Sequence, residues 1–273
     1  MGTDSTYTLG HHESVLRSHR WRTAENSAAY LLPHLSAGLR VLDVGCGPGT
    51  ITADLAGLVG AEGAVLGVDR SAEVIATARA ESADAGAGNV SYAVGDVMAL
   101  DVPDATYDVV HAHQVLQHLR DPVGALRELH RVTRPGGLIA VREADYGAMT
   151  WHPESADLDG WLALYRATSR YNGTELDAGR RLLMWARQAG LGDVTPSASV
   201  WCFATPQDRR WWGGLQADRI LHSAIAEQAV AASLADRAAL ERMSAAWQAW
   251  VQAEDGWFTV LHGEILCRSA NVG

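Results

Sequence analysis

Short apolar runs alternate with amphipathic stretches along the first half of the chain. Buried strands are predicted at GLRVLDVG, AVLGVD, NVSYAVGD, YDVVHAH and LIAVRE, which occupy residues 38–45, 64–69, 89–96, 107–113 and 138–143. Helices are predicted over residues 50–58 and 71–85, and after Asp121-Pro122, where a cap and a first-turn proline begin a helix. Strands that alternate with helices at this spacing indicate right-handed βαβ units in one parallel sheet.

The pattern changes after residue 143. A helix is predicted over 175–190, strands over 193–205 and 257–269, and a helical stretch from Thr205-Pro206 to about residue 252. Residues 13–36, ahead of the first strand, are also predicted to be helical. We expect six segments: an N-terminal arm (1–36), a core (37–143), a first insert (144–174), a core helix and strand (175–205), a second, helical insert (206–256), and a last strand with the C-terminus (257–273).

The first strand runs into VLDVGCGPGT, residues 41–50, which has glycines at 45, 47 and 49. Glycine lets the backbone turn sharply and approach a ligand without a Cβ in the way. A strand that ends in such a turn at a helix N-terminus offers free N–H groups to an anionic group. Dinucleotide folds use G-x-G-x-x-G here, but the third glycine comes one residue early and position 50 is threonine.

Two carboxylates follow at the ends of the next strands. Asp69 ends the second strand, twenty residues after Gly49, where a carboxylate can accept hydrogen bonds from both ribose hydroxyls. Asp96 ends the third strand, within reach of an adenine amino group. Because the carboxyl ends of parallel strands meet at one edge, the three sites together predict one nucleoside lying across that edge.

The segments VLDVGCGPGT, GVD, VGD and RPGG together resemble the class I S-adenosylmethionine-dependent methyltransferases, over about residues 20–145. The group resembled most is that of the ubiquinone/menaquinone biosynthesis C-methyltransferases. The region before the core resembles a bacterial subset that methylates prenylated natural products, as in teleocidin B formation. The resemblance implies an α/β, Rossmann-like sheet of seven strands in the order 3-2-1-4-5-7-6, with an antiparallel edge at 193–205 and 257–269 and with helical lid inserts.

The resemblance also implies the cofactor contacts. The methionine portion of S-adenosylmethionine would lie along the glycine turn, the ribose at the second strand end, the adenine at the third, and the sulfonium beside the end of the fourth strand; the product would be S-adenosylhomocysteine. A guanidinium from the arm would reach the cofactor carboxylate, with a surface ion pair as its alternative role. The predicted cofactor-binding residues are Asp43, Gly45, Gly47, Asp69, Arg70, Asp96, Val97, His113, Gln114 and Arg22.

Composition narrows the choice of partners. The 273 residues carry a formal net charge of −10, which argues against nucleic-acid substrates. The chain has no lysine, which excludes Walker-type phosphate binding and Schiff-base chemistry. Its three cysteines show no C-x-x-C spacing, so no metal site is expected. Without a long apolar run or a signal-peptide pattern we expect a cytoplasmic protein with no membrane span, whose copies could associate through the arm or the lid.

Proton acceptors for the reaction are predicted at Glu143, His118 and His11. Each has an alternative: Glu143 would not line the site, His118 would be a hydrogen-bonded structural histidine, and His11 would belong to a solvated terminus. The tryptophans of the inserts suit a large apolar substrate, and packing within the lid is their alternative role. The predicted substrate-binding residues are Tyr7, His12, Asp145, Trp151 and Trp212.

The functional hypothesis is methyl transfer from S-adenosylmethionine to a hydrophobic small molecule in secondary metabolism: a quinol, or a prenylated or aromatic natural product. Carbon is favoured over oxygen as the acceptor atom. One alternative is a cofactor-binding regulatory or partner protein without turnover. The other is an NAD-dependent oxidoreductase, which Thr50 and the missing lysine disfavour.

Overall fold

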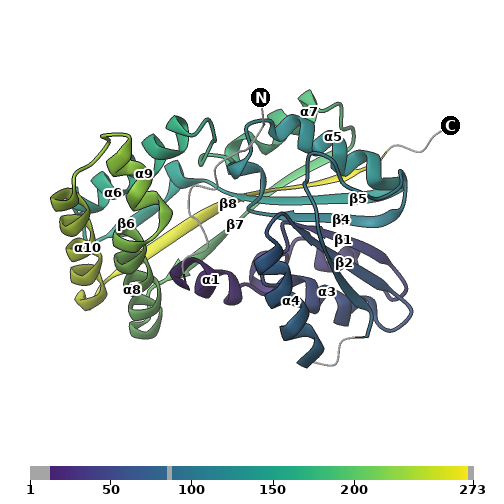
Figure 1. Ribbon diagram of the computed structural model, residues 1–273, viewed down its shortest axis with the longest axis horizontal. Helices are drawn as coiled ribbons and strands as arrows, with labels where there is room; N and C mark the ends of the chain where they lie inside the picture. Colours follow the sequence, from purple (N-terminus) through teal and green to yellow (C-terminus); the bar gives the residue numbers. More distant parts are fainter. Residues whose placement is uncertain (1–12, 85–87, 270–273) are drawn as a thin grey trace.

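The computed structural model describes residues 13–84 and 88–269. Its centre is a sheet in the order β3-β2-β1-β4-β5-β8, in which β8 also pairs with β6 and β7 (Figure 1). The strands β1 to β5 are parallel, and β8 is antiparallel to β5, β6 and β7. The strands are β1 (Arg40–Val44), β2 (Ala64–Asp69), β3 (Val90–Val94), β4 (Tyr107–His113), β5 (Thr133–Ala144), β6 (Thr150–His152), β7 (Val194–Phe203) and β8 (Trp257–Arg268).

Alternating side chains of the strands pack against helices on both faces of the sheet. Val41, Val65 and Val109 face one side, where they pack with Leu31 and with Leu55 of α3. On the other face, neighbouring strand residues pack against α5 and α7. The helices described are α1 (Glu13–Arg20), α2 (Ala24–Ser27), α3 (Thr50–Val59), α4 (Ala72–Asp84), α5 (Pro122–Val132), α6 (Ala156–Tyr171), α7 (Leu182–Gln188), α8 (Pro206–His222), α9 (Ala224–Ala231) and α10 (Arg237–Gln252).

The predicted order 3-2-1-4-5-7-6 is confirmed, because β7 and β8 are the strands expected at 193–205 and 257–269. The three-residue strand β6 is an addition to the seven expected. It pairs with the first residues of β8, beyond the part of β8 that pairs with β5. The long strand β8 therefore carries the sheet from the core into the region of α6, α8, α9 and α10, seen at the left of Figure 1.

The single helix expected over 13–36 is wrong in its extent. The segment divides into α1, α2 and a short 3-10 turn, Leu32–His34. Thr23 breaks it, because its side chain caps α2 by accepting from the backbone N–H of Asn26 at 3.2 Å, while the side-chain oxygen of Asn26 accepts from the backbone N–H of Thr23 at 2.9 Å. The helix expected over 175–190 is likewise shorter, since α7 begins only at Leu182 after a 3-10 turn.

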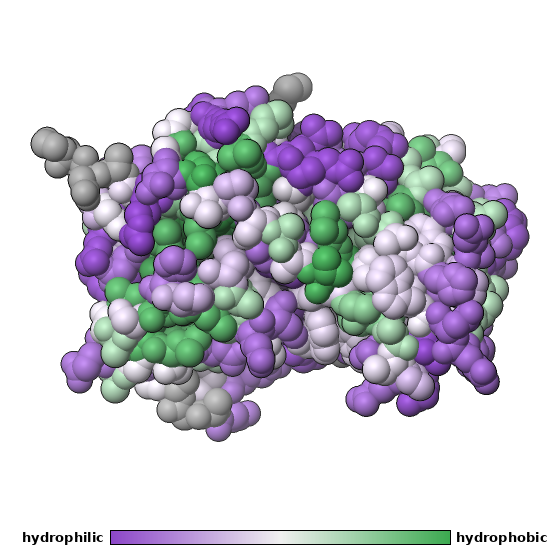
Figure 2. Space-filling model, turned by 180° about the vertical axis from the view of Figure 1, so that it is seen from behind, coloured by the Kyte–Doolittle hydropathy of each residue, from purple (hydrophilic) through white to green (hydrophobic). Residues whose placement is uncertain are grey.

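The helices α6, α8 and α10 and the start of β8 contribute to an aromatic core, which we call the lid core after the lid predicted for residues 144–174 and 206–256: Trp161, Trp212, Trp247, Trp250 and Phe258. Trp161 and Trp247 are fully buried and meet edge to face, with ring centroids 5.0 Å apart. On the face shown in Figure 2, the green apolar patches lie mainly over the half that carries the parallel strands, and the lid half is largely pale and purple. In the part of the chain that the structure describes, no helix is long and apolar enough to cross a bilayer.

Candidate active site

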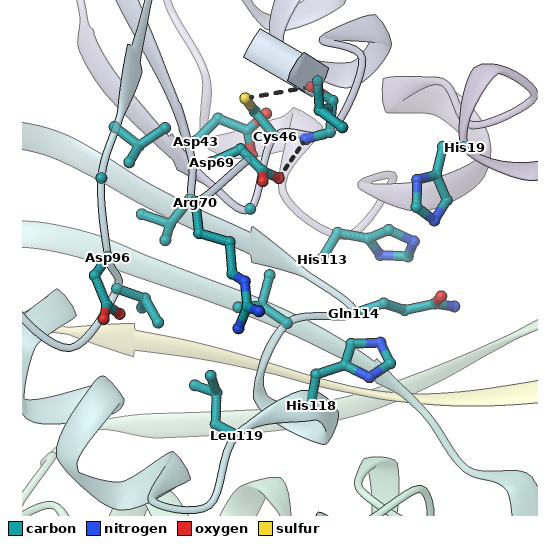
Figure 3. A pocket seen from close by; sticks show the side chains of 18 of the residues that line it. His19, Asp43, Cys46, Asp69, Arg70, Asp96, His113, Gln114, His118 and Leu119 are labelled. Atoms are coloured by element: carbon teal, nitrogen blue, oxygen red, sulfur yellow. Dashed lines mark hydrogen bonds between the residues drawn. The ribbon is translucent and has the colours of Figure 1, made fainter. Parts of the chain in front are cut away.

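A cavity of about 670 Å³ lies at the carboxyl edge of the parallel strands, with walls from the turns after β1, β2, β3 and β4 and from the N-terminal arm. Figure 3 shows Asp69 and Asp96 toward one side and the rings of His19, His113 and His118 toward the other. We call these sides the carboxylate end and the imidazole end. All ten residues predicted to bind the cofactor line this cavity: Arg22, Asp43, Gly45, Gly47, Asp69, Arg70, Asp96, Val97, His113 and Gln114.

The glycine turn after β1 needs its glycines. Gly45 and Gly49 have φ of 70° and 86°, in the left-handed region that other residues avoid. A Cβ on Gly49 would lie 2.5 Å from the Tyr92 hydroxyl, and one on Gly45 would overlap the side chain of Val115. Because α3 starts directly after this turn, at Thr50, the free N–H groups of a helix N-terminus lie at the cavity wall.

The carboxylate end is built from strand-end aspartates tied to the backbone. Asp69 accepts from the N–H of Gly47 at 3.1 Å with one oxygen and from the N–H of Ser71 at 3.0 Å with the other. Asp96 accepts from the N–H of Met98 at 2.9 Å. These bonds fix both carboxylates at the cavity while leaving lone pairs for a ligand, because a carboxylate offers about four acceptor positions.

Asp43, also on the cavity wall, is almost wholly buried and is held from two sides. The Thr52 hydroxyl donates to one carboxylate oxygen at 2.6 Å, and His111 Nδ1 lies 2.7 Å from the other. Both oxygens of the buried carboxylate therefore have a hydrogen-bond partner, and the Asp43 side chain is held in one position at the cavity wall.

The imidazole end contains two histidines that stay neutral, His113 and His118. Burial and the nearby Arg22 hold the pKa of His118 at about 3. Burial, Arg22 and Arg142 lower the pKa of His113 well below its ordinary value. Both ring nitrogens of His113 are without a hydrogen-bond partner among the described residues, although the ring lines the cavity. This end therefore presents the neutral rings of His113 and His118 close to the guanidinium of Arg22.

The arm brings two residues to the imidazole end. Arg22 donates from Nη2 to the side-chain oxygen of Gln114 at 2.7 Å. His19, at the end of α1, accepts at its carbonyl from the Thr50 hydroxyl, at 3.3 Å, which ties the arm to the start of α3. His19 was not predicted from the sequence, because the arm was expected to be one continuous helix with no turn between His19 and Arg22. The sequence offered one signal for His19, its position three residues before Arg22, which was predicted to bind the cofactor.

Glu143 lies beneath the cavity and does not line it. The side chain is fully buried and accepts from three backbone N–H groups: those of Val115 at 2.9 Å, Leu116 at 2.7 Å and Gln117 at 3.3 Å. Its carboxylate thus holds the turn that follows β4. Glu143, predicted as a proton acceptor, thus supports the backbone of this turn and is not among the residues that line the cavity.

The described residues predicted to bind substrate also lie away from the cavity. Asp145 is fully buried and paired with Arg180, whose Nε and Nη2 each lie 2.6 Å from a carboxylate oxygen. Trp212 stacks on Phe203 with ring centroids 4.4 Å apart, and Trp151 stacks on Phe258 at 5.8 Å. These placements correct the expectation that the three residues line the site. The remaining predicted residues, Tyr7, His11 and His12, lie outside the described residues.

The sequence profile of the family described as "Methyltransferase domain" matches residues 35–211. The chain is also 38% identical over 268 residues to an uncharacterized methyltransferase, C1B3.06c, of Schizosaccharomyces pombe, with 95% of each chain covered. This chain belongs to the methyltransferase family. A demethylmenaquinone methyltransferase of Shouchella clausii is 38% identical over 109 residues, covering 40% of this chain and 46% of its own.

A solved structure shares the methyltransferase fold: phosphoethanolamine N-methyltransferase 2 of Haemonchus contortus, in complex with phosphomonomethylethanolamine and S-adenosylhomocysteine. It superposes with a TM-score of 0.57 at 18% identity, over 89% of this chain and 52% of that one. The family match confirms the expected enzyme class and S-adenosylmethionine as the cofactor of this methyltransferase. The donor set fits that cofactor, since the cavity offers a glycine turn with helix N–H groups, two strand-end carboxylates and a guanidinium.

Proposed function

We propose that this methyltransferase transfers the methyl group of S-adenosylmethionine to a hydrophobic small molecule in natural product biosynthesis, at carbon in preference to oxygen. The observation that carries the proposal is that one cavity contains both the carboxylate end and the imidazole end. A cofactor spread along the carboxylate end would direct its reactive group toward the imidazole end, where the arm and the turn after β4 enclose the remaining space.

The chain's own residues would share the work of binding. Asp69 would accept hydrogen bonds from the ribose hydroxyls, Asp96 and Val97 would hold the adenine, and the glycine turn would border the methionine portion. Arg22 would hold the cofactor carboxylate as a charge-assisted pair. When bound, the cofactor supplies an electrophilic methyl group on a sulfonium. The protein then contributes position and exclusion of water, the main requirements of an in-line displacement.

The preference for carbon is supported by the low basicity of two histidines that line the cavity, His113 and His118. Methylation of an ordinary hydroxyl needs a group that takes its proton near neutral pH. His118, with a pKa of about 3, holds a proton poorly, and burial together with two guanidinium groups disfavours the proton on His113 as well. Glu143 does not line the cavity. An electron-rich carbon needs no such base before it attacks.

The preference for a hydrophobic acceptor is supported by what surrounds the imidazole end. Val115 and Leu119 are among the residues that line the cavity. Trp201 lies 5.7 Å from the His113 ring, and Trp21 of the arm meets Trp201 edge to face at 5.1 Å. We assign residues 144–174 and 206–256 as the lid over this end. One relative in the family carries the name demethylmenaquinone methyltransferase, which agrees with a quinol-like acceptor.

Cofactor carrying a trideuterated methyl group tests the proposal. The protein is incubated with this cofactor and with an apolar extract of the cells that make it, and products are searched by mass spectrometry for one labelled methyl group. The proposal predicts a labelled lipophilic product whose fragments retain the label on carbon. The matched control is Asp69→Ala, which should form the product far more slowly. A label carried on oxygen would overturn the preference for carbon, and S-adenosylhomocysteine binding without any labelled product would favour the non-catalytic alternative.

A further inference from the structure

Gln114, the first residue after β4, has an unusual backbone. Its φ is 54°, in the left-handed region that costs a non-glycine residue about 1 kcal/mol or more. Such strain persists only where the surrounding structure compensates for it. The side-chain amide of Gln114 is bonded on both sides, to Arg22 of the arm and to His262 of β8.

The three side chains form a relay with one consistent arrangement of hydrogens. Arg22 has only donors, so the oxygen of the Gln114 amide must face it, and the Nη2···Oε1 distance is 2.7 Å. The amide nitrogen then donates to Nε2 of His262, 2.8 Å away. His262 Nδ1 carries the proton and donates to the carbonyl of Val260 at 3.1 Å.

Every other arrangement brings two donors together. A flipped Gln114 amide would direct its NH₂ group at the guanidinium of Arg22, and a protonated His262 would direct an N–H at that same NH₂ group. Burial opposes the protonation of His262, and so do the charges of Arg142 on β5 and Arg22 on the arm. They outweigh the hydrogen bond to the Val260 carbonyl and lower the pKa of His262 well below its ordinary value. The His113 ring stacks on His262 at 6.0 Å, and the Trp201 ring lies 4.3 Å away.

We propose that His262 is a positioning residue that acts through Gln114 to hold Arg22 at the imidazole end of the cavity. The inference rests on the proposed role of Arg22 toward the cofactor carboxylate. The relay joins the arm, the end of β4 and the last strand, which are 92 and 148 residues apart in sequence. A neutral His262 with an acceptor at Nε2 keeps Gln114 in one orientation, and that orientation presents only an oxygen to Arg22.

The tautomer of His262 tests the relay without any ligand. In protein labelled with ¹⁵N-histidine, the relay predicts an Nδ1–H tautomer for His262, the opposite of the form that free histidine prefers, with no titration between about pH 5 and 8. In Gln114→Glu, an oxygen replaces the amide NH₂, so His262 should bind a proton at clearly higher pH than in the wild type. An Nε2–H tautomer, or an ordinary titration near pH 6.5 in the wild type, would overturn the relay.

A double-mutant cycle on S-adenosylhomocysteine affinity tests the action on Arg22. By isothermal titration, His262→Phe should weaken binding about five- to tenfold by removing the acceptor, and His262→Gln, whose carbonyl can accept, should recover most of the loss. In an Arg22→Met background, His262→Phe should have no further effect. Equal losses in both backgrounds, or an Arg22→Met variant with wild-type affinity, would overturn the inference. A wild type that binds no S-adenosylhomocysteine would instead refute the proposed function. The ¹⁵N measurement of the His262 tautomer would still test the relay in that case.

Discussion

At the carboxylate end of the cavity, Asp69 and Asp96 are held by hydrogen bonds from backbone N–H groups. In the lid core, large aromatic rings are held mainly by apolar packing: Trp247 contacts Trp161 at 5.0 Å and Phe258 at 5.1 Å. No tryptophan of the described chain lines the cavity. We infer from this difference that cofactor binding and the stability of the lid core depend on separate sets of residues, so each can be changed alone.

The largest effect on stability is expected from a substitution in the lid core that leaves the cavity unchanged. Trp247→Ala removes a fully buried ring and should lower the free energy of unfolding by about 3–5 kcal/mol, measured by urea denaturation. The affinity for S-adenosylhomocysteine of the folded fraction should stay within about twofold of the wild type, since additivity holds for distant sites. Trp257→Ala, at a ring 40% exposed, is the matched control and should cost about 1 kcal/mol or less. A loss of affinity in Trp247→Ala as large as its loss of stability would mean that the regions are coupled.

The next effect concerns the turn beneath the imidazole end. Burial raises the pKa of Glu143 from 4.5 to about 7. Between these values the folded state holds a proton that the unfolded state has lost, so this contribution to stability is full below about pH 4.5 and is lost as pH rises through about 7. Its size is about 3 kcal/mol across that window.

Comparison with Glu143→Gln measures this contribution. The variant cannot titrate at this position, so urea unfolding at a series of pH values should show a shallower fall of stability between pH 4.5 and 7 than in the wild type. Parallel curves for the two proteins would show that Glu143 is ionised in the folded state throughout, with the three backbone N–H groups outweighing its burial.

A smaller effect on stability, but a large one on binding, is expected at the glycine turn. Gly49→Ala forces a side chain into a backbone with φ of 86° and into contact with Tyr92, and should cost about 2 kcal/mol. S-adenosylhomocysteine affinity should fall more than about tenfold, because the turn shapes the cavity wall. Gly57→Ala, in α3 with no heavy atom near its added Cβ, is the control and should stabilise by about 0.5–1 kcal/mol with unchanged affinity. Equal affinity in the two variants would contradict the role given to the turn.

Most of the carboxylate end could be predicted because its signals are local. A strand, a glycine turn and a strand-end aspartate each occupy a few consecutive residues, and the parallel topology brings the strand ends together without further information. The order of the sheet followed from the same alternation. The break at Thr23 was missed because its capping partner is Asn26 and not the usual glutamate or glutamine.

The imidazole end could be predicted only in part, because its residues meet through long-range packing. His113 and Gln114 follow a predicted strand, but His262 reaches them from β8, after the whole lid. Composition does not show whether a tryptophan side chain packs in a core or faces a ligand. Trp151 and Trp212 were expected to contact the substrate, but they stack on Phe258 and Phe203. Glu143 was correctly placed at a strand end, yet nothing local shows that three backbone N–H groups occupy it.

We infer that the strand ends and the glycine turn bind the cofactor of this methyltransferase. Isothermal titration of S-adenosylhomocysteine into the wild type and into Asp69→Ala tests it most directly. We expect one site per chain in the wild type and an affinity at least about tenfold weaker in Asp69→Ala, since that variant loses the proposed acceptor for the ribose. A wild type that does not bind, or equal affinity in both proteins, would show that the strand ends do not bind the cofactor in this way.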